Sequence, residues 1–489
     1  MSIANGCTTT QVIRGKTMDK RNFVCDYIDN NKNIFIDAAN AVWGYAEPGM
    51  QEYKSAEYLE KVCEDNGFKV TKGVAEIPTA FVAEWGEGHP IIGFLAEYDA
   101  LPGLSQEGSC NVHKPLDEAN TAYGHGCGHH LLGAGAMAGA FGLKEYLEKN
   151  NIKGTVRYYG CPGEEYGSGK AFMAREGLFD DVDACFTWHP GDRNEIVTGG
   201  SLACYSIFFK FAGKTAHAAG APHMGRSALD ACELMNVGVN YLREHVIPEA
   251  RMHYAYTDVG GIAPNVVQDH AGLHYFVRAP RVADMMAILE RIKDIAKGAA
   301  LMTGTTVQDI THEALSDFVP NDTLNVMAHK ALTEVGLYDL DDADMEMAKK
   351  FREAVTDEEV ANSVREFKTT YGIDLSGNLF NRPISPLRNI ELASKGSTDV
   401  GDTSYCTPTV QFHVATQIIG TPGHSWKITG QGTTSYAHKG MLTAGKAMAL
   451  AGIYALEDPE LCKKAREELD SKTNGGYKCP MPADLKPTI

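Results

Sequence analysis

Three histidines and one cysteine fall within six consecutive positions of the glycine-rich stretch Y-G-H-G-C-G-H-H-L-L-G-A-G: His125, Cys127, His129 and His130. Cysteine thiolate and neutral imidazole are preferred ligands of zinc and of its first-row neighbours. The glycines between them let the backbone bend closely around an ion. Helical sequence follows at 129–149, which predicts that the cluster lies in a loop leading into a helix N-terminus. Taken alone, the cluster is equally consistent with ordinary hydrogen-bonded loop side chains.

Other metal-ligand residue types recur where predicted strands end. The strand at 91–95 is followed by Glu97 and Asp99, the strand at 154–160 by the pair Glu164 and Glu165, and the strand at 183–188 by His189; a loop after the strand at 409–413 holds His424. Each has an ordinary interpretation as a solvated or hydrogen-bonded side chain. A parallel sheet, however, brings the carboxyl ends of its strands to one edge, so we expect these residues to meet there.

The elements that must position them alternate between strands and helices. Short β-rich runs at 68–71, 80–84, 91–95, 154–160 and 183–188 are interspersed with helical patterns at 20–47, 55–66, 129–149 and 169–176. Such alternation predicts an α/β fold with a mostly parallel sheet and helices on both faces. A strand at 409–413 and a helix at 435–456 complete this catalytic domain.

A different pattern begins near residue 203. Strands at 203–211, 252–260, 271–278 and 305–313 and helices at 225–246 and 282–303 follow the order β-α-β-β-α-β of a ferredoxin-like unit. We therefore predict a catalytic domain in two parts, 1–202 and 315–489, with an inserted α+β lid and dimerisation domain at 203–314. The region 314–395 is the least clear, and its charged run at 341–368 is interpreted as a solvated helical segment.

Composition excludes several classes of function. The 489-residue chain has a formal net charge of −18, which argues against binding nucleic acid or anionic membranes because both need a basic surface. The apolar runs are too short to span a membrane. The 12 cysteines show no disulfide-framework spacing, and the stretch ending at Asp19 has no apolar core typical of a secretory leader. These observations predict a cytoplasmic protein with reduced thiols.

Several motifs, in this order along the chain, resemble one known family. They are A-E-Y-D-A-L-P-G-L-S-Q, G-H-G-C-G-H, P-G-E-E, the stretch H-A-A-G-A-P-H-M-G-R-S-A-L-D-A from His217, S-T-D-V-G-D and G-T-P-G-H-S. The chain resembles the bimetallic aminoacylase/carboxypeptidase family of metallo-amidohydrolases. Within that family it is similar to the branch in which a cysteine replaces the bridging aspartate. The resemblance covers nearly the whole chain.

The resemblance implies a role for each residue at the sheet edge. Cys127 would bridge two divalent metal ions, and the other ligands would be His129, Glu165, His189 and His424. Glu164 would be the general base that takes a proton from water and returns it to the leaving amine. Asp99 would orient a metal-bound side chain, whereas Glu97 stands where relatives outside this branch have a ligand histidine.

The resemblance also assigns residues in the inserted domain. His217 would reach the active site of a partner subunit and stabilise the oxyanion; the alternative is a solvent-exposed loop histidine. Asn265 and Arg278 would hold the carboxylate of the substrate, although Arg278 equally suits a strand-end salt bridge.

The expected activity is therefore cleavage of the amide bond of an N-acyl or N-aroyl amino acid, a small-molecule substrate, by an enzyme with two divalent metal ions per subunit. Zinc follows from the Irving–Williams order, whereas the resemblance implies manganese. His130 stands where the branch commonly has Asp or Asn, which leaves the metal preference open. The alternatives are a dipeptidase or general N-acyl-amino-acid deacylase, and a subunit that needs a related partner chain. We expect a homodimer, or a heterodimer with such a partner.

Overall fold

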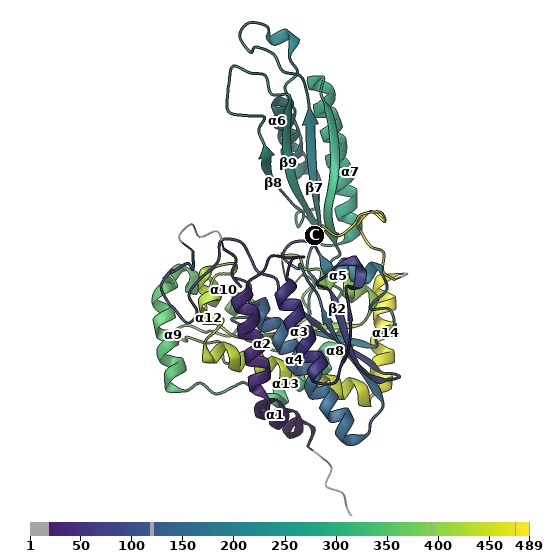
Figure 1. The fold of residues 1–489 in the computed structure, drawn as a ribbon, viewed down its shortest axis with the longest axis vertical. Coiled ribbons are helices and arrows are strands. Elements are labelled where there is room, and N and C mark those ends of the chain that lie inside the picture. Colours follow the sequence, from purple (N-terminus) through teal and green to yellow (C-terminus); the bar gives the residue numbers. More distant parts are fainter. Residues whose placement is uncertain (1–18, 118–121, 393, 395, 475, 489) are drawn as a thin grey trace, which may run out of the picture.

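A computed structural model describes residues 19–117, 122–392, 394, 396–474 and 476–488. The first 18 residues, for which the sequence predicts no secretory leader, lie outside these ranges. The strands form two sheets, one of seven strands and one of four. The smaller sheet and its helices extend away from the larger unit (Figure 1). Within the described residues, no helix is both long and apolar enough to cross a membrane.

The seven-stranded sheet has the order β1-β2-β4-β3-β5-β11-β6. Strands β4, β3, β5 and β11 run parallel, whereas β1, β2 and β6 pair antiparallel at the two edges. Burial of β3 is complete along its length, as expected for a central parallel strand covered on both faces. The strands are β1 Lys69–Lys72, β2 Phe81–Glu87, β3 Ile91–Ala96, β4 Gly154–Gly160, β5 Ala184–Gly191, β6 Glu195–Ile196 and β11 Thr409–Ala415.

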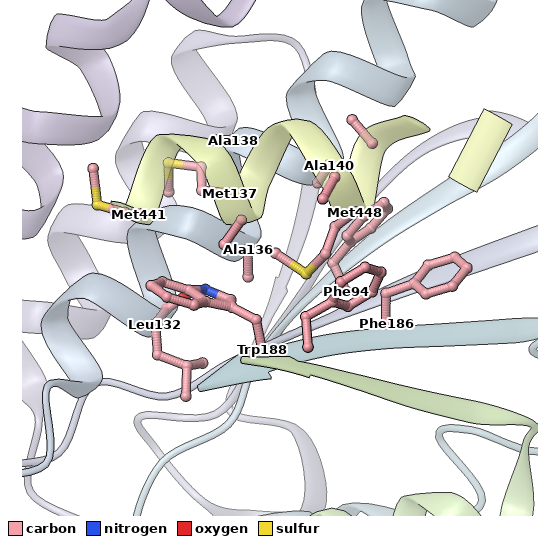
Figure 2. Packing of buried hydrophobic residues seen from close by; sticks show 14 of the residues in the cluster. Phe94, Leu132, Ala136, Met137, Ala138, Ala140, Phe186, Trp188, Met441 and Met448 are labelled. Carbon is pink, nitrogen blue, oxygen red and sulfur yellow. The ribbon is translucent and has the colours of Figure 1, made fainter. Parts of the chain in front are cut away.

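Helices cover both faces of this sheet. On one face, α4 and α13 lie side by side and enclose a core with Phe94, Phe186 and Trp188 from the strands (Figure 2). On the other face, α5 and α11 pack over a second apolar cluster. The helices of this unit are α1 Lys20–Asn30, α2 Lys32–Tyr45, α3 Tyr53–Asp65, α4 His129–Asn150, α5 Gly169–Arg175, α8 Asp322–Val335, α9 Asp342–Ala354, α10 Asp357–Tyr371, α11 Val400–Cys406, α12 Trp426–Gln431, α13 Ser435–Glu457 and α14 Pro459–Thr473.

The four-stranded sheet is antiparallel in the order β10-β7-β9-β8. Its elements are β7 Ala203–Ala212, α6 Ala228–Leu242, β8 Arg251–Asp258, β9 His270–Ala279, α7 Val282–Thr303 and β10 Thr306–Leu315. This β-α-β-β-α-β order is the predicted ferredoxin-like unit. Three short 3₁₀ helices, Val74–Glu76, Pro222–Met224 and Arg243–His245, complete the described helices and strands.

Two helical predictions differ from the structure. The pattern at 20–47 is two helices, because Asn31 ends α1, where its backbone N–H and its side chain both bond to the Tyr27 carbonyl. The charged run at 341–368 is likewise two helices, and Thr356 starts the second with a capping box. This run is also less solvated than expected, because Phe351 and Phe367 are buried.

Candidate metal centre

The parallel strands deliver the predicted residues to one edge of the large sheet. Glu97 and Asp99 follow the end of β3, where both side chains are buried. Glu164 and Glu165 follow β4, and His189 lies on β5, which pairs with β3. This is the edge at which ligands bind in open α/β sheets.

The cysteine-containing loop is held against this edge by close backbone packing. Gly128 has a φ of +81°, and a Cβ atom there would lie 2.7 Å from Pro190, so the loop needs glycine at this position. The next residue, His129, begins α4. Cys127 and His189 thereby approach each other, with Cys127 Sγ 3.4 Å from His189 Nε2.

Two groups of potential metal ligands share one cysteine. Cys127, His129 and His189 form the first group, and Cys127, Glu165 and His424 form the second. Within each group, the potential ligand atoms all lie within 4.8 Å of one another. All five predicted ligands therefore lie around one point of the sheet edge.

The two buried members of these groups present unpaired donor atoms. Asp99 Oδ1 lies 2.7 Å from His129 Nδ1, which leaves His129 Nε2 buried without a hydrogen-bond partner. The other oxygen of Asp99 accepts a hydrogen bond from the backbone N–H of Glu165 at 2.8 Å. Glu165 Oε1 is also buried without a hydrogen bond, although His424 Nε2 lies 3.3 Å away. Unpaired imidazole and carboxylate atoms among thiol and histidine neighbours fit divalent cations.

Charges at this edge reinforce the fit. Burial, with the nearby charge of Glu165, raises the pKa of the Cys127 thiol, so a cation is needed for the thiolate to form there. Burial lowers the pKa of His189 and favours the neutral imidazole that binds metals. Burial would raise the pKa of Glu165, but His424 and His129 outweigh it and keep this pKa below its usual value.

Glu164 has different surroundings from its neighbour. Its Oε2 lies 3.9 Å from His129 Nε2, and Glu97 Oε2 lies 3.3 Å from the same nitrogen. These three residues form a further group of potential ligands. Burial, and then the charges of Glu97 and Glu165, raise the pKa of Glu164 well above its usual value. A carboxylate with raised proton affinity is suited to accept a proton from water.

The three predicted residues of the 203–314 segment do not join this cluster. His217 and Asn265 neighbour each other on exposed loops, where the Ala218 N–H donates to the Asn265 carbonyl at 3.0 Å. These loops lie beyond the ends of β7 and β8 that point away from the large sheet (Figure 1). Arg278 lies instead near the opposite end of its strand, and its Nη1 donates to Ser397 Oγ at 2.9 Å.

Two histidines of the initial cluster point elsewhere. His125 Nε2 lies 3.0 Å from the Val42 carbonyl and His130 Nε2 lies 3.1 Å from the Gly432 carbonyl. Both rings are buried, and neither belongs to a group of potential ligands within the described part of the chain.

Three residues at this edge were not found from the sequence. The buried Lys170 contacts Glu97 and Asp399, and His413 packs against His189 with ring centroids 5.9 Å apart. Asp399 belongs to the S-T-D-V-G-D motif, which was the available signal. Lys170 has no such signal, because only the tertiary fold brings its helix against β3.

Comparison with known proteins decides the family. The model of peptidase family M20/M25/M40 matches residues 93–375. The chain belongs to this family. Membership confirms the resemblance found from the sequence motifs, and it also confirms the expected enzyme class, a hydrolase of linear amide bonds.

Two curated relatives match most of the chain. One of the named subunits of the p-aminobenzoyl-glutamate hydrolase of Escherichia coli (strain K12) is 42% identical over 476 residues, which are 95% of this chain and 98% of that protein. The Xaa-Arg dipeptidase of Mus musculus is 28% identical over 449 residues, which are 89% of this chain and 88% of that protein.

Solved structures share the fold at lower identity. An aminobenzoyl-glutamate utilization protein from Klebsiella pneumoniae superposes with a TM-score of 0.56 at 16% identity, covering 88% of this chain and 98% of that one. A dinuclear metal binding peptidase of the M20 family from Bacillus subtilis gives a TM-score of 0.53 at 17% identity, covering 87% of this chain and 99% of that one.

Proposed function

We propose that this chain is a two-metal amidohydrolase that cleaves the amide bond of an N-acyl or N-aroyl amino acid. The observation that supports this most is the sharing of Cys127 between two groups of potential ligands. His129 and His189 would complete one site, and Glu165 and His424 the other. Manganese and zinc are both compatible with this mixed set of N, O and S donors.

Divalent ions bound there would lower the pKa of a water molecule and polarise the scissile carbonyl group. Glu164 would accept the proton of the attacking water and deliver it to the nitrogen of the leaving amine, which keeps the proton count balanced. Asp99 would hold the ring of His129 in one tautomer through the contact with Nδ1.

The substrate class follows from the relatives. The Escherichia coli relative at 42% identity is named for hydrolysis of p-aminobenzoyl-glutamate, so the proposed substrate has an aroyl group linked to glutamate or a similar amino acid. Arg278 and Asn265 would bind its carboxylate. Because that relative is named as one of several subunits, a related partner chain is also compatible with the name.

The 203–314 segment is the proposed lid and dimerisation domain. Its strand β8 is an edge strand, and the exposed side chains of Leu234, Val237 and Tyr241 lie along α6. Edge strands and apolar helix faces are surfaces on which protein chains associate. In a homodimer, His217 would enter the partner's active site and donate a hydrogen bond to the carbonyl oxygen as negative charge develops there.

The second candidate is a dipeptidase, because the mouse relative is an Xaa-Arg dipeptidase. The two are distinguished by assaying the purified chain, without a second kind of chain, against p-aminobenzoyl-glutamate, N-acetyl-glutamate and a panel of dipeptides. We expect the highest kcat/KM for p-aminobenzoyl-glutamate. Preference for dipeptides would support the second candidate, and activity restored only by a related chain would support an obligate heteromer.

A further inference from the structure

A buried lysine lies directly behind the candidate metal centre. Lys170 is in the first turn of α5 and has a fully buried side chain. Its Nζ lies 2.6 Å from Asp399 Oδ1 and 2.7 Å from Glu97 Oε1. The backbone N–H of Lys170 donates to the other oxygen of Asp399 at 2.9 Å. Both carboxylates are buried as well, so this is a closed network and not a surface ion pair.

One member of the network also faces the metal ligands. Glu97 gives Oε1 to Lys170 and turns Oε2 toward the unpaired Nε2 of His129, 3.3 Å away. Glu97 therefore lies between a fixed ammonium group and the atoms that would bind a cation. A carboxylate held by an ammonium group is less available to a metal ion, because both compete for the same negative charge.

Charge balance gives the lysine a second effect. The carboxylates of Glu97, Asp99, Glu164, Glu165 and Asp399 lie at or beside this edge. Among the described residues, Lys170 is the lysine or arginine that forms salt bridges with any of them. Burial would lower the pKa of Lys170, but the charges of Asp399 and Glu97 raise it well above its usual value, which keeps the ammonium charged.

We propose that Lys170 is a positioning residue that occupies Glu97 and so prevents this carboxylate from becoming an additional metal ligand. The proposal rests on the two-metal function proposed above. It predicts that loss of the lysine side chain tightens metal binding while impairing turnover. Glu97 would then turn toward the ions and change the ligand set around His129.

The test compares Lys170→Met, which retains length without charge, with the wild type and with Lys61→Met, a matched control at an exposed lysine of α3. Dissociation constants for Zn²⁺ and Mn²⁺ are measured by competition with a coloured chelator, and melting temperatures are recorded with and without metal. We expect Lys170→Met to bind metal at least about tenfold more tightly and to gain more thermal stability from metal than the wild type. Turnover should fall, and Lys61→Met should match the wild type.

A double variant separates positioning from simple charge and covers a folding failure of the single variant. Lys170→Met with Asp399→Asn keeps the net charge of the network but still releases Glu97, so it should also tighten metal binding. Adding Glu97→Gln should abolish the gain. Unchanged or weaker metal binding in the double variant would overturn the proposal, even where wild-type metal binding supports the two-metal function.

Discussion

Glu164 and Glu165 are adjacent in the sequence but make different contacts. Glu165 Oε1 lies 3.3 Å from His424 and in the group that includes Cys127, whereas Glu164 faces His129 at 3.9 Å. If Glu164 is the base, Glu164→Gln should lower kcat on the order of 10²–10⁴-fold with two metals retained per chain. Glu165→Gln should instead release metal, because it removes a ligand.

Metal content measured by mass spectrometry, with kcat on the same preparations, checks this pair of variants. Each variant is the other's control, since both remove one carboxylate charge at neighbouring positions. Loss of metal from Glu164→Gln, or full metal content with normal activity in Glu165→Gln, would contradict the assigned roles.

The sequence predicted the residues that follow strand ends, and it could do so for a physical reason. Glu97, Asp99 and Glu165 come from different strands, yet parallel pairing necessarily brings their strand ends together. Lys170 could not be predicted in the same way. A lysine in a short helix is usually solvated, and only the packing of α5 beside Asp399 makes this one a buried cation.

At the scale of elements, α4 and α13 approach closely because their contact consists of small residues. A Cβ atom on Gly445 would lie 2.6 Å from the Cβ of Ala138, so Gly445→Ala must push the helices apart. Overpacking of this kind costs about 1–3 kcal/mol. At Gly298 of α7 a Cβ would meet nothing within 4 Å, and Gly298→Ala should stabilise by up to about 1 kcal/mol through helix propensity.

Urea unfolding of the two variants and the wild type measures both effects, and Gly298→Ala is the matched control. We expect opposite signs for the change in the free energy of unfolding. Equal stabilisation of both variants would show that the contact between α4 and α13 is looser than the structure has it.

The order of elements was largely predictable, whereas some of their boundaries were not. Alternating strand and helix patterns fix an α/β unit because the periods of 2 and 3.6 residues differ clearly. Helix breaks depend on local capping: Asn31 and Thr356 divide continuous helical patterns, and the T-x-x-E box from Thr356 to Glu359 was a signal in the sequence that was missed.

At the scale of the whole molecule, His217 lies on an exposed loop remote from the metal ligands of its own chain (Figure 1). If it completes the partner's site, activity belongs to the dimer. His217→Ala should then lower kcat by about 10²–10³-fold with metal content retained. Light scattering should show a dimer at micromolar concentration.

Mixing two inactive variants tests this exchange of residues. In a dimer of His217→Ala with Glu164→Ala, one site carries both lesions and the other carries neither. After random exchange of chains, half of the dimers are mixed and each has one intact site, so about a quarter of the wild-type activity should return. A mixture that stays inactive after exchange has been demonstrated would place the action of His217 within its own chain or outside catalysis.

The central claim is that two divalent ions held around Cys127 are needed for amide hydrolysis. The most direct measurement titrates metal-free protein with Mn²⁺ or Zn²⁺ and follows hydrolysis of p-aminobenzoyl-glutamate against the number of ions bound per chain. We predict no activity in the metal-free protein, full activity at two ions per chain, and loss of the shared binding in Cys127→Ser. Full activity without metal, or with one ion per chain, would contradict this account.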